Sequence, residues 1–321
     1  LPLPPLAERV FLVTGSTDGI GKFTAELLAK EGCTVLIHGR NPAKIESTLA
    51  ELRALAPDAT LHGFQADLSS MEEVRGLAAE VSGRFPKIHG LLNNAGTFDG
   101  DYTGRRVVTS EGNEYSLAVN VLAPFLLTSL LLGAVRASGA GRVLATSSIS
   151  KGAGDALDDL QLERGWSGHR AYSLSKLCDA MMAPAEGRRN ARRARPAQCM
   201  KVVTDPHTSK EIMEMHERYA EPPKLCFHTM DPGTVDTKML RAGWWDGGAS
   251  VRTATTSFRM LTRDSYQEAS GSSLGGGEVR DPELRARLWS DLDAWEQRSA
   301  GGKGPGGQAA AAGATLQQLN A

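Results

Sequence analysis

The sequence predicts an α/β fold with a doubly wound parallel sheet, in which helices cover both faces of the sheet. Short apolar runs alternate with longer segments of helical periodicity over most of the chain. Because two consecutive parallel strands need a right-handed crossover that contains a helix, this alternation favours a series of βαβ units. The runs are apolar throughout, which is typical of strands that are covered on both faces.

The expected strands and helices follow one another in order. Six apolar runs are predicted to form strands, at 9–13, 34–38, 61–65, 88–93, 142–146 and 225–230. Five periodic segments are predicted to form helices, at 19–31, 42–56, 71–81, 112–137 and 171–183. A closing helix is indicated by one apolar face near the C-terminus, formed by Leu284, Leu288, Trp289, Leu292 and Trp295.

Length and composition favour one large domain. The chain has 321 residues, of which 41% are hydrophobic and 23% are charged. We expect a single domain over residues 1–298, with an insertion at about 186–223, and a disordered low-complexity tail over 299–321. The insertion opens with an arginine-dense stretch. Since the formal net charge is only -1, we interpret this stretch as a solvated surface and expect no nucleic-acid partner.

The cysteines and the apolar segments bear on the compartment. The four cysteines are scattered without metal-ligand spacing, so we expect reduced thiols and no metal site. The apolar stretch 121–135 is short and interrupted by Pro124, which predicts a buried or interface helix and no transmembrane segment. Residues 1–6 lack a basic region and are expected to form an extended arm, not a secretory signal. We expect a protein of the cytoplasm or of a reducing organellar lumen.

A glycine-rich turn predicts a Rossmann-type nucleotide site. It lies between the first expected strand and the first expected helix and reads Gly15-Ser16-Thr17-Asp18-Gly19-Ile20-Gly21. The three glycines allow a tight turn and a close approach of the backbone, and the helix N-terminus offers free N–H groups to a pyrophosphate. The motif is informative because it stands between a strand and a helix of a βαβ series.

The end of the second expected strand bears on the type of nucleotide. An NAD-selective site usually places a carboxylate there for the ribose 2′-hydroxyl, whereas this chain has Gly39 followed by Arg40. A guanidinium can bind a 2′-phosphate through charge-assisted hydrogen bonds, so we predict NADP(H), with NAD(H) as the alternative. Arg40 is otherwise an exposed loop cation. After the third strand, Asp67 and Leu68 are candidates for the adenine end, and Asp67 is also a candidate cap for the helix at Met71.

Tyr172 and Lys176 are four residues apart in a predicted helix, so both side chains lie on one face. A phenol is a poor acid or base at neutral pH, but a nearby ammonium favours its ionised form. The pair therefore predicts a general acid/base. On spacing alone, the match is weak, because this pattern occurs often by chance.

These pieces together resemble the short-chain dehydrogenase/reductase family over roughly residues 8–240. The resemblance rests on an ordered series of motifs: Thr14-Gly15-x3-Gly19-Ile20-Gly21, Asp67, Asn93-Asn94-Ala95-Gly96, Asn120, Ser147-Ser148, Tyr172-x3-Lys176 and Pro232-Gly233. The segments 120–125 and 158–165 resemble the branch that contains retinol dehydrogenases and related reductases of lipophilic carbonyls. The resemblance implies a cofactor site that also includes Asn94, Ala95, Gly96, Pro232, Gly233 and Thr237, together with Tyr172 and Lys176.

The resemblance also implies a catalytic set of Asn120, Ser148, Tyr172 and Lys176. In this set, Tyr172 exchanges a proton with the substrate oxygen, Lys176 favours the phenolate and holds the nicotinamide ribose, and Ser148 hydrogen-bonds the substrate oxygen. Asn120 sustains a water-linked relay through Lys176. Ser148 is preferred over Ser147 because the second serine of this pattern normally serves. Each residue also has a structural alternative: Ser148 finishes a strand, Asn120 satisfies a helix irregularity, and Lys176 is a solvated helix charge.

The sequence thus predicts an NADP(H)-dependent oxidoreductase that interconverts a carbonyl and an alcohol on a lipophilic small molecule. Trp244 and Trp245 either line its substrate pocket or pack. The alternative is an inactive nucleotide-binding regulatory or scaffold protein of the same fold, because Pro184 breaks the helix of Tyr172 and insertions flank it. We also expect a homo-oligomer, since the helices at 112–137 and 171–183 correspond to those that form dimer interfaces in the family.

Overall fold

The predicted parallel sheet is confirmed. The computed structural model describes residues 3–98, 104–182, 226–244, 247–263 and 282–301. Within them, six parallel strands pair in the order β3-β2-β1-β4-β5-β6. They are β1 (Val10–Val13), β2 (Thr34–Gly39), β3 (Thr60–Gln65), β4 (Gly90–Asn93), β5 (Arg142–Thr146) and β6 (Cys226–Met230). The order reverses between β1 and β4, which is where open sheets of this type bind ligands.

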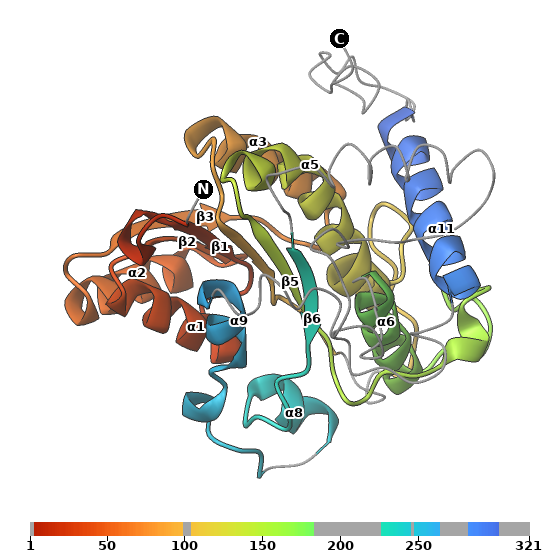
Figure 1. The fold of residues 1–321 in the computed structure, drawn as a ribbon. Helices are drawn as coiled ribbons and strands as arrows, with labels where there is room; N and C mark the ends of the chain where they lie inside the picture. The colour runs from red at the N-terminus through yellow and green to blue at the C-terminus, as the bar shows by residue number, and fades with distance from the viewer. Residues whose placement is uncertain (1–2, 99–103, 183–225, 245–246, 264–281, 302–321) are drawn as a thin grey trace, which may run out of the picture.

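Helices cover both faces of the sheet, as Figure 1 shows. One face carries α1 (Gly19–Lys30), α2 (Pro42–Leu55) and α9 (Thr256–Thr262). The other carries α3 (Met71–Arg84), α5 (Ala123–Ala137) and α6 (Gly168–Met182), with α11 (Pro282–Gly301) packed outside on α6. The short elements are α4 (Tyr115–Leu117), α8 (Lys238–Gly243), η1 (Leu6–Glu8), η3 (Ala118–Leu122), η4 (Gly154–Ala156) and η5 (Val251–Thr253).

The two faces of the sheet bury separate apolar clusters. In β1, the side chain of Leu12 packs toward α3 and α5, whereas Phe11 and Val13 pack toward α1 and α2. Neighbouring strands repeat this alternation, and most strand residues are buried, although β3, at the edge of the sheet, leaves Thr60 and Gln65 exposed. This double burial explains why the strands are apolar throughout in the sequence.

Several boundaries differ from the sequence-based expectation. The strand expected from residue 88 begins at Gly90, and α6 begins at Gly168, three residues before the expected start. α11 confirms the closing helix, with Leu288 and Leu292 buried, and it runs to Gly301, inside the expected tail. The expectations on Pro184, on the insertion, on Trp245 and on residues 302–321 lie outside the described residues.

The apolar helix that was expected not to span a membrane is longer than the sequence indicated. α4, η3 and α5 form one continuous helix of 23 residues, Tyr115–Ala137, and its most apolar window has a mean hydropathy of 2.0. By length and composition alone it is long enough to cross a bilayer, so the length argument was wrong. However, 67% of its most apolar window is buried inside the fold, as in the core helix of a globular domain. In the described part of the chain it is the single helix that meets these criteria.

The first turn of α1 allows a direct test of close packing. A Cβ atom at Gly21 would lie 2.5 Å from both the Asn94 side-chain nitrogen and the Gly15 carbonyl oxygen. We expect Gly21→Ala to lower the free energy of unfolding by about 1–3 kcal/mol, because the backbone of the turn must move. Gly76, exposed in α3 with no atom within 4 Å of such a Cβ, is the matched control. Gly76→Ala should raise stability by roughly 0.5–1 kcal/mol.

Both values are to be measured by urea denaturation. Equal stability of Gly21→Ala and the wild type would contradict the close contact between α1 and the turn.

Candidate active site

A cavity of about 490 Å³ opens at the carboxyl edge of the sheet, around the point where the strand order reverses. Most of the predicted cofactor residues line it, namely Gly15, Thr17, Gly19, Ile20, Arg40, Asp67, Leu68, Asn94, Ala95, Gly96, Pro232, Gly233 and Thr237. Three predicted catalytic residues line the same cavity: Ser148, Tyr172 and Lys176. Ser16, Gly21 and Asn120 do not line it.

Hydrogen bonds join the glycine turn after β1 to the turn after β4. The Thr14 hydroxyl accepts from the backbone N–H groups of Asn94 (2.9 Å) and Ala95 (3.0 Å). The Asn94 side-chain amide donates in return to the Thr14 carbonyl (3.0 Å). At Gly15, φ is +63°, and an added Cβ would lie 2.9 Å from the Cα of Ala95. Glycine is therefore required at this position by both conformation and space.

His38, at the end of β2, was not among the predicted site residues. Its Nδ1 accepts from the backbone N–H of Gly15 (3.1 Å), and its Nε2 lies 3.2 Å from the Ala66 carbonyl. Because the backbone N–H of Gly15 can only donate, the ring proton belongs on Nε2, where it can be donated to Ala66. Burial lowers the pKa of His38 to about 4, although the Ala66 hydrogen bond and the charge of Asp67 oppose this change. The imidazole is thus a neutral brace for the glycine turn.

Ser16 supports the same brace instead of facing the cavity. It is fully buried, and its hydroxyl oxygen accepts from the backbone N–H of His38 (2.9 Å). Gly21 is also buried, where it lets α1 approach the turn. The sequence motif therefore mixes residues that face the cavity with residues that hold those in place.

Arg40 and Asp67 lie at the edge of the cavity with polar partners. The exposed guanidinium of Arg40 donates to the hydroxyl of Tyr115 in α4 (3.2 Å). The Asp67 carboxylate accepts from both the backbone N–H (2.9 Å) and the hydroxyl (2.8 Å) of Ser69. The cap of α3 is Ser70, which accepts from the N–H of Glu73, so Asp67 does not itself cap the helix.

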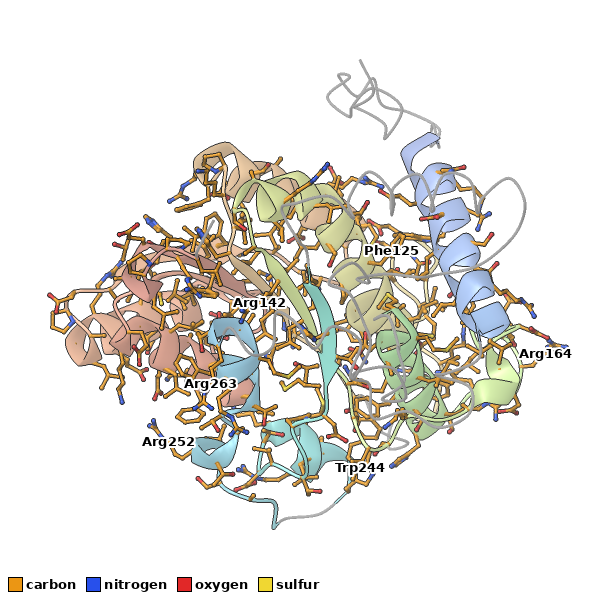
Figure 2. The ribbon with its side chains drawn as sticks, in the orientation of Figure 1. Phe125, Arg142, Arg164, Trp244, Arg252 and Arg263 are labelled. Carbon is orange, nitrogen blue, oxygen red and sulfur yellow. The ribbon has the colours of Figure 1, made fainter. Side chains whose placement is uncertain are left out.

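Tyr172 lies in α6 among other rings. Its ring centroid is 5.4 Å from that of Phe98 and 5.2 Å from that of Trp244, both at tilted or edge-on angles. His169 contacts Phe98 and Trp244 in turn, with centroids 4.9 and 5.4 Å away. Figure 2 shows Trp244 near α8, below the end of β6. These rings leave Tyr172 buried at the wall of the cavity.

Lys176 is not a solvated helix charge, because its side chain is only 5% exposed. Its Nζ lies 5.9 Å from the centroid of the Tyr172 ring, and it donates to the Thr146 carbonyl at the end of β5 (2.8 Å). It also pairs with the Asp179 carboxylate (2.8 Å), which was not predicted. Burial lowers the pKa of Lys176, but the charges of Asp179 and Tyr172 outweigh it and raise that pKa above its usual value. Burial raises the pKa of Asp179 to about 6, although Lys176 opposes it.

The two serines after β5 have different surroundings. Ser147 is buried, and its hydroxyl donates to the Lys176 carbonyl (2.9 Å), so it fixes α6 against the sheet. Ser148 is partly exposed at the cavity, and its hydroxyl oxygen accepts from the N–H of Ser150 (3.1 Å). Both serines line the cavity, but the Ser147 hydroxyl already donates to the Lys176 carbonyl, whereas Ser148 is the more exposed of the two.

Asn120 lies in η3, a π-helical turn, and is buried. Its side-chain oxygen accepts from the N–H of Thr97 (2.8 Å), and its nitrogen donates to the Thr97 carbonyl (3.0 Å) and to the Ser175 hydroxyl (2.9 Å). The side chain thereby connects the loop after β4 with α6. This geometry agrees with the structural alternative, in which Asn120 accompanies a helix irregularity, and it leaves the proposed relay untested.

Residues 9–157 match the family model described as short chain dehydrogenase. Polyprenol dehydrogenase of Mus musculus is 32% identical over an alignment 321 positions long, which covers 90% of this chain and 84% of that protein. Retinol dehydrogenase 12 of Homo sapiens is 36% identical over 177 residues, which cover 55% of each chain.

A solved structure shares the fold. A short chain dehydrogenase from Shigella flexneri 2a, complexed with NADP, is similar with a TM-score of 0.59 and 24% identity. The similarity covers 82% of this chain and 95% of that one. At this level of identity, it supports the arrangement of the sheet and its helices.

The neutral state of His38 predicts acid sensitivity. Unfolded histidine binds a proton near its ordinary pKa of 6.5, whereas His38 in the fold resists protonation until about 4. Between these values the unfolded chain binds more protons, so the free energy of unfolding should fall as the pH drops from about 6.5 to 4. A difference of this size corresponds to about 3 kcal/mol. The pH dependence is measured by urea denaturation at fixed ionic strength.

His38→Gln should flatten this pH dependence, because an amide has no proton to gain. His89→Gln is the matched variant on the other side of β1, where burial also lowers a histidine pKa to about 4. An unchanged slope in both variants would exclude histidine protonation as the cause.

Proposed function

This chain belongs to the short-chain dehydrogenase/reductase family, in its retinol dehydrogenase-like branch, and is therefore an NAD(P)-dependent oxidoreductase. From this we propose that it interconverts a carbonyl and an alcohol on a lipophilic small molecule. The proposed cofactor is NADP(H), and the proposed general acid/base is Tyr172. One observation carries the proposal: Ser148, Tyr172 and Lys176 line the same cavity as the glycine turn.

The residues around the cavity fit a dinucleotide phosphate. Gly15 and Gly19 both have positive φ and bring backbone to the cavity wall at the N-terminus of α1. The Asp18 carboxylate at this helix end would repel phosphate, but it is paired with Lys238 from α8. At the end of β2, Arg40 supplies an exposed cation where an NAD-selective site would hold an acid. This cation supports NADP(H) over NAD(H).

The chemistry assigned to the protein is binding, orientation and proton transfer. The nicotinamide, when bound, supplies or accepts the hydride. In carbonyl reduction, Tyr172 gives its phenolic proton to the substrate oxygen, and in alcohol oxidation it takes the proton back. Ser148 donates a hydrogen bond to the same oxygen as negative charge develops on it. Lys176 places a positive charge near the phenol, which favours the phenolate.

The walls near Tyr172 support an apolar substrate. Val235, Met239, Leu240 and Trp244 line the cavity beside it, and Ile149 stands 65% exposed at its lining. Apolar side chains that line a cavity favour apolar ligands. Two relatives are named for polyprenol and retinol, which are both apolar alcohols.

Replacing Tyr172 tests the proton transfer. Tyr172→Phe keeps the ring contacts with Phe98 and Trp244 but removes the hydroxyl, so NADPH binding should stay and turnover should fall at least about 100-fold. Turnover is followed by NADPH absorbance with a panel of aliphatic and isoprenoid aldehydes, and binding by NADPH fluorescence. Ser148→Ala should lose turnover similarly, whereas Ser147→Ala should retain more of it.

The result also separates the two candidate classes of protein. If the wild type binds NADPH and turns over no member of the panel in either direction, the chain is a nucleotide-binding protein without this activity, and the proposal is wrong.

The choice of cofactor has its own test. Arg40→Ala should raise KM for NADPH by roughly 10–100-fold and change KM for NADH little, because one charged hydrogen bond to a 2′-phosphate is lost. Lys44→Ala removes a nearby exposed cation of α2 and serves as the control. Equal effects of Arg40→Ala on both cofactors would argue against a 2′-phosphate contact.

A further inference from the structure

The buried carboxylate of Asp179 has no role in the proposed mechanism, but it contacts the ammonium of Lys176, which does. Asp179 lies on α6, three residues after Lys176 and therefore on the same helix face. Its Oδ2 is 2.8 Å from the Nζ of Lys176, and the two side chains are 4% and 5% exposed. A buried charge is costly unless it is paired, so each of these two groups stabilises the other in its position.

The pairing determines how the ammonium can act at the cavity. An ammonium has three N–H donors, and here one goes to the Thr146 carbonyl and one to Asp179, both at 2.8 Å. One donor is left for the cavity that Lys176 lines. The orientation of this remaining N–H is thus set by β5 on one side and by Asp179 on the other.

The pairing also changes the electrostatic environment of the phenol. A lone ammonium near Tyr172 favours the phenolate, but an ammonium with a carboxylate at 2.8 Å acts more nearly as a dipole. The dipole has a weaker effect at the distance of the Tyr172 ring, which is 5.9 Å from Nζ. Asp179 therefore weakens the electrostatic effect of the ammonium at the phenol.

We propose that Asp179 is a positioning residue that orients the Lys176 ammonium and reduces its effect on Tyr172, and that it thereby sets the pH range in which the proton transfer works. The assignment rests on the proposed function of Tyr172. In reduction, the proton passes from the Tyr172 hydroxyl to the substrate oxygen, so a phenol that stays protonated at neutral pH is the competent form. In oxidation, the phenolate is the competent form. Because Asp179 weakens the effect of the Lys176 ammonium on Tyr172, oxidation needs a higher pH than it would beside a lone ammonium.

Groups on the elements around α6 do not take over this role. β5 contributes the Thr146 carbonyl, and α4 and η3 contribute Tyr115, the Glu114 cap, which accepts from Leu117 and Trp166, and the neutral Asn120. Titratable groups on packed elements also include Arg142 of β5, which donates to the Met260 carbonyl, His228 of β6, and Asp155 of η4, which pairs with Arg170. On α11 they include Asp291 and Glu296, which interact with Arg287 and Arg75, as well as Asp293 and Arg298. Within the described residues, Lys176 is the charged group that acts on Asp179.

The experiment removes the charge of Asp179 and reads Tyr172 in two ways. Asp179→Asn keeps the shape, and Asp179→Leu is an apolar substitute of similar volume should the amide variant not fold. The first readout is the pH profile of kcat/KM for alcohol oxidation. The second is tyrosinate absorbance at about 295 nm between pH 6 and 10, taken as the difference from the matching Tyr172→Phe variant. Circular dichroism and NADPH fluorescence establish folding.

We expect the acid limb of the profile and the Tyr172 absorbance change to move to lower pH by roughly half a unit or more in Asp179→Asn and Asp179→Leu. Asp179→Glu, which keeps the charge, should restore the wild-type profile. Asp155→Asn removes an exposed carboxylate, paired with Arg170, and should leave both readouts unchanged.

The inference is overturned if the profile of a folded Asp179 variant stays at the wild-type pH or moves upward, or if Asp155→Asn shifts it equally. The absorbance readout needs no turnover. A shifted absorbance without turnover in any variant would therefore refute the proposed function while supporting the role of Asp179.

Discussion

The hydrogen-bonded contact between the turns after β1 and β4 is the constraint on which the site depends. Parallel pairing brings these strands together although they are far apart in sequence, and the Thr14 hydroxyl then bonds two successive N–H groups of the second turn. Only because Gly15 has no side chain can Ala95 approach so closely. Hydrogen bonds extend from both turns to the rest of the site. The N–H of Gly15, in the first turn, donates to His38, and the N–H of Thr97, after the second turn, donates to Asn120.

Features that depend on local sequence could be predicted. The strands were recognised because burial on both faces requires apolar residues throughout, and α1 because a glycine turn precedes a segment of helical periodicity. Tyr172 and Lys176 were placed on one face because helix geometry alone determines their spacing. Their meeting with the glycine turn in one cavity followed from the order of parallel strands, which the sequence pattern also indicated.

Features that depend on contacts between remote segments could not. Asp179 is only three residues from Lys176, so its place on the same helix face follows from local spacing, but the burial that makes this pair significant comes from the packing of α6 in the fold. His38 carries no motif, since its role arises from two backbone groups on different turns. The composition of the apolar helix Tyr115–Ala137 fits a core helix and a membrane span equally well. It is the burial of most of its apolar window inside the fold, not its sequence, that is typical of a core helix.

The π-helical turn of that helix has a consequence for how the protein can change over evolution. Tyr115, before the turn, contacts Arg40 at one end of the cavity, whereas Asn120, inside it, contacts Ser175 in α6. Removing one residue between them would rotate one contact by about 100° relative to the other. The insertion or deletion of one codon in this stretch would therefore remove the alignment of the two contacts in a single step.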